Sequence, residues 1–161
     1  MRYNFHNSVY IHPNVCLGNN VEIQPGSIIG ALGAIRGCRD HKGKIIIEDN
    51  VKIGANCVIN IGAEGETRIA KGSWVMNMTN IGHNVMIGEA CEIGAHSIIC
   101  GHCEIGDEVI IKSGVIIRNR LLIMDGITIG MGAVVTKDLT KKGVYYGNPA
   151  RQKGEGWECY G

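Results

Sequence analysis

The sequence predicts an all-β protein in which a short strand and a turn repeat every six residues and wind into a parallel β-helix. Three observations favour this fold class. Isoleucine or valine recurs at every sixth position, glycine often follows it, and the 161 residues include 24 glycines but one phenylalanine and two tryptophans. Many glycines and β-branched residues are typical of strands and turns rather than of a helical bundle.

The six-residue period extends along most of the chain. Twelve consecutive positions spaced by six, from Ile69 to Val135, are isoleucine or valine, and an upstream set behaves alike from Ile11 to Ile59. An α-helix would scatter every sixth residue around its axis, and a flat strand of period two leaves the intervening positions unexplained. A triangular coil of three strand–turn units, about 18 residues long, explains both sets. The repeated side chain then points inward, glycine occupies turns where a Cβ would crowd, and coils stack about 4.8 Å apart.

A single domain over residues 1–161 is expected, with coils from about 8 to 135. Two stretches interrupt the repeat: 30–44, which is polar and glycine-rich, and 60–68, where the frame slips by four residues. Both are predicted to be loop excursions, either binding elements or tolerated insertions. Residues 136–161 lack the repeat and are predicted to form a cap or tail, which closes the open end of such a coil.

Composition narrows the classes of partner. The formal net charge of +1 gives no electrostatic case for nucleic acid or an anionic membrane. No segment approaches the roughly 18 apolar residues of a membrane helix, and the N-terminus has no apolar run typical of a signal peptide. The seven cysteines show neither an even count nor metal-pair spacing. We therefore expect a cytoplasmic protein without a metal site, in which Cys57, Cys91 and Cys103 pack inward.

The repeat of an aliphatic residue, glycine and a small residue resembles the signature of the hexapeptide acyltransferases. Residues 80–88, Asn-Ile-Gly-His-Asn-Val-Met-Ile-Gly, are similar to the histidine segment of the sugar-nucleotide acyltransferases of lipid A synthesis, and residues 29–59 resemble the UDP-acylglucosamine N-acyltransferases among them. Residues 129–135 and 147–151 resemble instead the acetyl-CoA-using branch, which includes N-acetyltransferases of bacterial amino-sugar nucleotides.

The resemblance implies a left-handed coil, a homotrimer with active sites between subunits, acetyl-CoA as the acyl donor and a sugar nucleotide as the acceptor. The lipid A N-acyltransferases carry an extra N-terminal domain and a helical C-terminal extension, for which 161 residues leave no room. A short acyl group from coenzyme A therefore fits better than a long chain on a carrier protein.

Acyl transfer from a thioester needs a general base for the acceptor and hydrogen-bond donors for the oxyanion. His83 lies two residues after Ile81, at a predicted corner. Its resemblance to the family histidine implies the general base, whereas a lone histidine would otherwise be read as a surface residue. Asn84 follows and can hold a tautomer by hydrogen bonding but adds no charge. Glu92 or a residue of another subunit is an alternative partner.

The donor is predicted to lie along the column that starts at His83. One coil further on, Gly101 corresponds to the residue whose amide the family uses for the oxyanion, and His102 beside it is a further catalytic candidate. Asn119 and Lys137 continue the same 18-residue step toward the coenzyme A phosphates. Further candidates for donor binding, each with a turn or a solvated charge as its alternative role, are Ser113, Gly114, Met131, Gly132, Arg151, Lys141 and Lys142.

Two other functions stay open at this stage. A zinc lyase similar to the γ-type carbonic anhydrases would need three histidines with two of them five residues apart, whereas His96 and His102 are six apart. A non-catalytic β-helix scaffold is compatible with the fold. The acceptor's identity, and amine against hydroxyl, are not specified; Arg36, Arg39, Lys42 and Lys44 are candidates for holding its phosphates.

Overall fold

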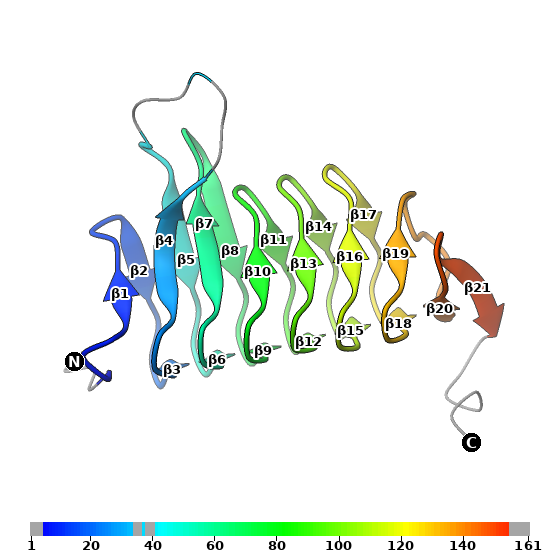
Figure 1. The fold of residues 1–161 in the computed structure, drawn as a ribbon, viewed down its shortest axis with the longest axis horizontal. Coiled ribbons are helices and arrows are strands. Elements are labelled where there is room, and N and C mark those ends of the chain that lie inside the picture. The colour runs from blue at the N-terminus through cyan, green and yellow to red at the C-terminus, as the bar shows by residue number, and fades with distance from the viewer. Residues whose placement is uncertain (1–4, 34–36, 38–40, 155–161) are drawn as a thin grey trace.

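The computed structural model describes residues 5–33, 37 and 41–154, which form a parallel β-solenoid (Figure 1). The described residues contain no helix. The strands are β1 Tyr10–Ile11, β2 Val15–Leu17, β3 Glu22–Ile23, β4 Ile28–Leu32, β5 Lys44–Ile47, β6 Lys52–Ile53, β7 Val58–Ile61, β8 Glu66–Ile69, β9 Trp74–Val75, β10 Asn80–Ile81, β11 Met86–Ile87, β12 Glu92–Ile93, β13 Ile98–Ile99, β14 Glu104–Ile105, β15 Ile110–Ile111, β16 Ile116–Ile117, β17 Leu122–Ile123, β18 Thr128–Ile129, β19 Val134–Val135, β20 Val144–Tyr146 and β21 Arg151–Gly154.

Every third strand joins the same sheet, so the prism has three faces. Sheet A has the order β1-β4-β7-β10-β13-β16-β19, sheet B the order β17-β14-β11-β8-β5-β2, and sheet C the order β21-β20-β18-β15-β12-β9-β6-β3. In Figure 1 the chain rises along sheet A, crosses to the more distant sheet B and returns through sheet C, advancing from N- to C-terminus. This sense of winding is left-handed. The prediction of an all-β parallel coil is confirmed.

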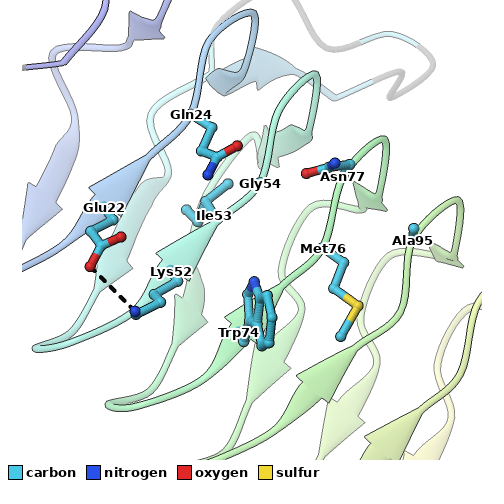
Figure 2. A pocket seen from close by; sticks show the side chains of 9 residues that line it. All are labelled: Glu22, Gln24, Lys52, Ile53, Gly54, Trp74, Met76, Asn77 and Ala95. Atoms are coloured by element: carbon cyan, nitrogen blue, oxygen red, sulfur yellow. Dashed lines mark ion pairs between the residues drawn. The ribbon is translucent and has the colours of Figure 1, made fainter.

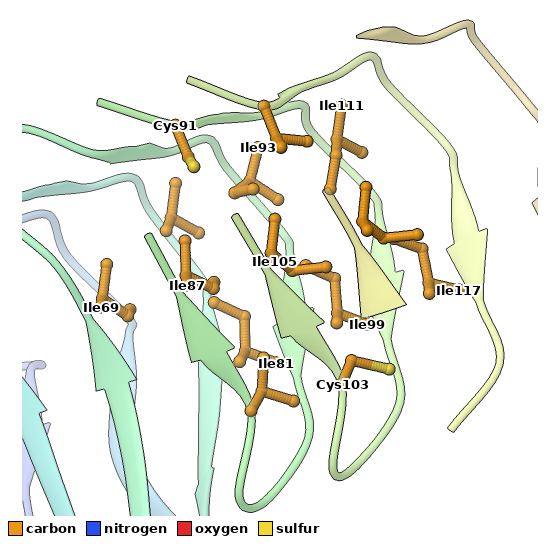
Figure 3. Packing of buried hydrophobic residues seen from close by; sticks show 14 of the residues in the cluster. Ile69, Ile81, Ile87, Cys91, Ile93, Ile99, Cys103, Ile105, Ile111 and Ile117 are labelled. Carbon is orange, nitrogen blue, oxygen red and sulfur yellow. The ribbon is translucent and has the colours of Figure 1, made fainter. Parts of the chain in front are cut away.

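The interior is a set of stacked isoleucine columns held in register by the sheets. Ile81 pairs with Ile99, Ile99 with Ile117 and Ile117 with Val135, and the side chains of all four are completely buried. Figure 3 shows how such side chains fill the space between the sheets. Full burial of an isoleucine stabilises the fold by about 1.5–3 kcal/mol. The 18-residue step read from the sequence is therefore the distance along the chain between stacked strands.

Small residues two positions before each anchor are also buried, and those that carry a hydroxyl or thiol bridge successive coils. Ser97 Oγ donates to the carbonyl of Lys112 at 3.1 Å and accepts from the Val115 N–H at 3.2 Å. Cys103 Sγ lies 3.1 Å from the Arg118 carbonyl in the same way. Burial raises the pKa of the Cys91 thiol to about 11, so this cysteine stays protonated and packs as predicted.

The corners of the prism require a left-handed backbone conformation. Asn84, His102 and Arg120 turn the chain from sheet A to sheet B with φ of 58°, 61° and 60°. The glycine after each anchor has a different role, since a Cβ on Gly94 would lie only 2.5 Å from the Ser113 nitrogen of the next coil. The close approach of stacked corners is thus what the repeated glycine permits.

The two predicted excursions differ from each other. Strand β4 extends to Leu32 and β5 begins at Lys44, so the first is a loop over the residues between them, of which 34–36 and 38–40 lie outside the described residues. The second is strand over most of its length, because β7 and β8 each run for four residues and leave only 62–65 as a turn. The frame slip therefore lengthens two strands and makes this corner project.

The end of the coil is closed by a short antiparallel pair. Strand β20 continues sheet C beside β18, and β21 folds back onto it, pairing Tyr146 with Arg151. Leu139 joins Ile123 through an isolated bridge and covers the end of the core. No helix among the described residues is long and apolar enough to span a membrane.

The columns give a direct test of the inward and outward assignment. Ile123 is completely buried, whereas the isomeric side chain of its neighbour Leu122 is 39% exposed. We expect Ile123→Ala to lower the free energy of unfolding by about 2–5 kcal/mol through the cavity it leaves. Leu122→Ala should lower it by less than about 1 kcal/mol. Urea unfolding at one fixed protein concentration measures both, and equal losses would contradict the inward assignment of Ile123.

Candidate functional site

The candidate site lies at the corner between sheets A and B, called here the AB corner. It contains residues 82–85 between β10 and β11 and, one coil further on, residues 100–103 between β13 and β14. His83 and Gly101 occupy equivalent positions in these two coils, as do Asn84 and His102. The 18-residue step therefore brings together residues that the sequence analysis singled out separately.

The His83 ring is held by its neighbour in sequence. His83 Nδ1 lies 2.9 Å from Asn84 Oδ1. Asn84 Nδ2 donates to the Glu64 carbonyl at 2.8 Å, and because a carbonyl only accepts, the amide nitrogen must face Glu64. Asn84 Oδ1 must then accept from His83, which places the ring proton on Nδ1. Nε2 is left unprotonated in the neutral ring and available to accept a proton.

Nε2 of His83 faces Gly101 in the next coil. A Cβ built on Gly101 would lie 3.0 Å from His83 Nε2 and 3.1 Å from the His83 carbonyl, so a side chain at 101 would crowd the imidazole. The chain is fixed here because His102 N–H donates to the His83 carbonyl at 3.0 Å. Among the described residues, none accepts a hydrogen bond from the Gly101 N–H. The predicted His83–Gly101 pair is thus adjacent in space.

His102 contacts the His83 ring from the side. The two ring centroids are 4.9 Å apart and the planes are nearly perpendicular, at 88°. The pKa of His102 is lowered, first because the ring is partly desolvated and then because positive charge on His83 and on Arg120 opposes its protonation. Two histidines this close are not both readily charged, so this pair holds at least one neutral imidazole near neutral pH.

The predicted donor residues divide between two corners. Asn119 and Lys137 continue the His83 column along the AB corner and are exposed. Ser113, Gly114, Met131 and Gly132 instead form the corner between sheets C and A, the CA corner, so within one chain they do not share a groove with His83. Arg151 lies in β21 at the C-terminal end, with Nη1 2.9 Å from the Ala150 carbonyl.

Other candidates lie away from the site. His96 is at the CA corner with φ of 59°, and Glu92 is on the outer face of sheet C, so Glu92 is not the partner of His83. Arg36 and Arg39 lie outside the described residues. Lys44 forms a 3.0 Å ion pair with Glu66. In the described part of the chain, no three histidine, cysteine or acidic side chains gather as a metal site would require.

Sequence reasoning missed four residues that adjoin His83 or its partners. A Cβ on Gly33 would lie 3.3 Å from His83 Cβ and Cδ2, so the start of the β4–β5 loop rests against the ring. His41 Nε2 lies 3.0 Å from the Gly33 carbonyl and holds the loop back onto itself. Arg120 could have been found by extending the 18-residue step from Asn84 through His102. The contribution of Glu64 had no sequence signal, because it acts through its backbone carbonyl.

Hollows on the surface do not coincide with His83. Figure 2 shows a pocket of about 440 Å³ on the side of sheet C, lined by Trp74, Met76 and the Glu22–Lys52 ion pair among others. Its lining contains no histidine. A second hollow, of about 630 Å³, lies beside Lys42, Gly43 and Gly65, at the foot of the loop that contacts His83. An open corner rather than an enclosed cavity therefore carries the paired histidines.

Comparison with known families identifies the repeat. Residues 87–119 match the family model described as bacterial transferase hexapeptide (six repeats), and residues 44–64 match the one described as hexapeptide repeat of succinyl-transferase. A UDP-3-O-acylglucosamine N-acyltransferase of Caulobacter vibrioides is 38% identical over 87 residues, which cover 50% of this chain and 26% of that protein. The same enzyme of Anaeromyxobacter dehalogenans is 34% identical over 97 residues, covering 52% and 27%. The chain spans about a quarter of the length of these relatives.

Solved structures share the fold at low identity. The UDP-N-acetylglucosamine acyltransferase of Bacteroides fragilis superposes with a TM-score of 0.77 at 21% identity, covering 94% of this chain and 74% of that one. Perosamine N-acetyltransferase of Caulobacter crescentus, solved with CoA and GDP-perosamine, gives 0.60 at 24% identity, covering 93% and 56%. These matches confirm the predicted hexapeptide repeats and the predicted resemblance to acyltransferases of sugar nucleotides.

The contact between the two histidines predicts a measurable titration. In His83→Ala the pKa of His102 should rise toward the ordinary value of about 6.5, since both the covering ring and a nearby positive charge are lost. NMR titration of the ring protons measures it. His96→Ala is the matched control, because His96 lies at the CA corner, and it should leave the His102 titration unchanged. A His102 pKa that is just as low without His83 would rule out the proposed coupling.

Proposed function

We propose that this hexapeptide-repeat protein is an acyltransferase that moves an acetyl group from coenzyme A to the amine or hydroxyl of a sugar nucleotide, with His83 as general base. The observation that carries the proposal is the fixed imidazole: Nδ1 is bound by Asn84, and Nε2 faces the Gly101 backbone of the next coil. The names of the curated relatives and of the structural neighbours, which are acyltransferases of sugar nucleotides, support this class of reaction.

The reaction needs one proton carrier and no covalent enzyme intermediate. His83 Nε2 takes a proton from the acceptor as its nitrogen or oxygen attacks the thioester carbonyl. The Gly101 N–H, which donates to none of the described residues, donates to the oxyanion of the tetrahedral intermediate. The carbon–sulfur bond then breaks, and the imidazolium returns its proton to the departing thiolate. Asn84 holds Nδ1–H throughout, which keeps the reactive nitrogen aimed at the acceptor.

The donor is proposed to lie along the AB corner toward the C-terminal end. Arg118, Asn119, Arg120 and Lys137 are all exposed there, one and two coils beyond Gly101 and its neighbours. Cations in this position suit the phosphates of coenzyme A, because charge-assisted hydrogen bonds to phosphate oxygens are stronger than neutral ones. The thioester would then reach His83 while the nucleotide end of the donor remains near the cations.

A homotrimer is proposed because it would complete this groove. Sheet A lies between the AB and CA corners, and its outer face exposes aliphatic side chains that include Ile28 and the directly paired Ile98 and Ile116. The outer faces of the other sheets carry charges, such as Glu104 on sheet B and Glu92 on sheet C. Packing through sheet A would set the AB corner of one subunit beside the CA corner of the next, where Ser113, Gly114, Met131 and Gly132 would meet the donor.

Charges introduced on the outer face of sheet A test the assembly. Ile98→Glu with Ile116→Glu should convert a trimer of three 17.4 kDa chains to a monomer, because buried unpaired carboxylates would oppose the interface. Sedimentation measures the mass. Leu122→Glu on sheet B is the control, since Leu122 is similarly exposed on another face, and it should stay trimeric. A monomeric parent protein, or a trimer that tolerates both substitutions, would refute packing through sheet A.

Removal of the base tests the reaction. Release of CoA from acetyl-CoA is measured with a panel of UDP-, dTDP- and GDP-amino sugars, and His83→Ala should lower kcat by at least about 10²-fold. His96→Ala should retain the parent rate because His96 lies at the CA corner. Turnover that does not depend on His83 would exclude it as the base. Absence of turnover with every acceptor would point instead to another acyl donor or to a scaffold.

A further inference from the structure

The turn between β7 and β8 encloses the side chain of Asn84 in the following coil. Asn84 Nδ2 donates to the Glu64 carbonyl at 2.8 Å, and Asn84 N–H donates to Thr67 Oγ1 at 2.8 Å. Thr67 is completely buried and its hydroxyl donates in turn to the Asn60 carbonyl at 3.1 Å. Both ends of Asn84 are therefore anchored to the preceding coil, while its Oδ1 binds His83.

Two glycines leave the space that this amide occupies. A Cβ on Gly62 would overlap Asn84 Oδ1, and a Cβ on Gly65 would lie 2.7 Å from Asn84 Nδ2. Gly65 also has φ of +76°, whereas no positive φ is recorded at Gly62. An alanine at 62 is thus opposed by the amide itself rather than by its own backbone. Glycine at 72 differs, because nothing lies within 4 Å of a Cβ built there.

The frame slip in the repeat is what brings this turn over Asn84. Anchors Ile59 and Ile69 are ten residues apart instead of six, and the extra residues lengthen β7 and β8 so that the corner projects. The turn is held from below by the returning loop, since Lys42 N–H donates to the Ala63 carbonyl at 2.7 Å and Lys44 N–H to the Gly65 carbonyl at 2.9 Å. It is therefore supported on one side and occupied by Asn84 on the other.

We propose that the turn Gly62–Gly65 is a positioning element that sets the tautomer of His83 by fixing which way the Asn84 amide faces. An amide rotated by half a turn would present Nδ2 to His83, and the ring would then need its proton on Nε2. That ring has no lone pair at Nε2 with which to accept a proton. The Glu64 carbonyl excludes this arrangement because it accepts only from the amide nitrogen, and the two glycines allow it to come close enough.

The inference rests on the proposed role of His83, but its test does not require turnover. Histidine labelled with ¹⁵N in the ring reports the tautomer, because protonated and unprotonated ring nitrogens have separate chemical shifts. The parent protein should show His83 with Nδ1–H and an unprotonated Nε2. In Gly62→Ala the Nε2 signal should move toward the protonated value, and Gly72→Ala should not move it.

A double variant separates positioning from a merely structural role. A carboxylate has two acceptor oxygens and no donor, so Asn84→Asp presents an acceptor to His83 whichever way it faces. Added to Gly62→Ala, it should restore the Nδ1–H tautomer. If an acceptor is found, kcat should fall by about 10²-fold in Gly62→Ala with little change in acceptor KM, and recover in the double variant.

The outcomes distinguish this inference from the proposed reaction. A parent protein with His83 protonated on Nε2, or a Gly62→Ala variant with the parent tautomer, would overturn it. Failure of the double variant to restore the tautomer would do the same, because the oxygens of the introduced carboxylate do not repair a general loss of packing at residue 62. The predicted tautomer in a protein that acylates no sugar nucleotide would instead leave the positioning element intact and remove the proposed reaction.

Discussion

The structure depends on the stacking of side chains 18 residues apart. Each coil places one inward aliphatic residue on each sheet, directly above its counterpart in the coil before, as Ile81, Ile99 and Ile117 show. A column of this kind tolerates little variation in size, because each residue contacts the same atoms of the next. Backbone hydrogen bonds between coils run along the same direction, so packing and pairing fix one register together. Everything at the corners inherits its spacing from that register.

The corners are where chemistry is possible, because the faces are occupied by pairing and the interior by packing. At the AB corner, the left-handed conformation of Asn84 and His102 turns the backbone sharply and exposes the residues beside it. His83 is contacted there by Asn84 along the chain and by Gly101 and His102 from the next coil. These contacts come from a rigid ladder, so the imidazole is oriented before any ligand binds, which is the condition for effective proton transfer.

Interruptions of the repeat supply the contacts that a regular coil does not. Regular corners stack flat on one another, whereas the projecting corners of β4–β5 and β7–β8 extend beyond the prism on the coils that precede His83 (Figure 1). Gly33 then rests against the imidazole, and Glu64 reaches the Asn84 amide. The irregular coils are thus placed beside the titratable groups, and the uniform coils beyond them provide the exposed cations of the same corner.

The sequence by itself determined the period, the inward columns and the adjacency of His83 and Gly101, because each of these follows from counting residues along a coil of fixed length. It also assigned Cys91 and Cys103 to the interior, since their positions fall in the small inward class. Only the tertiary structure decided that the 60–68 slip is a projecting pair of strands, that Glu92 is remote from His83, and that Ser113 and Met131 belong to a different corner from Lys137. The reason is physical: register along the coil repeats with the sequence, whereas the direction of a projecting turn and the partners of a backbone carbonyl arise from packing between coils and leave no periodic trace.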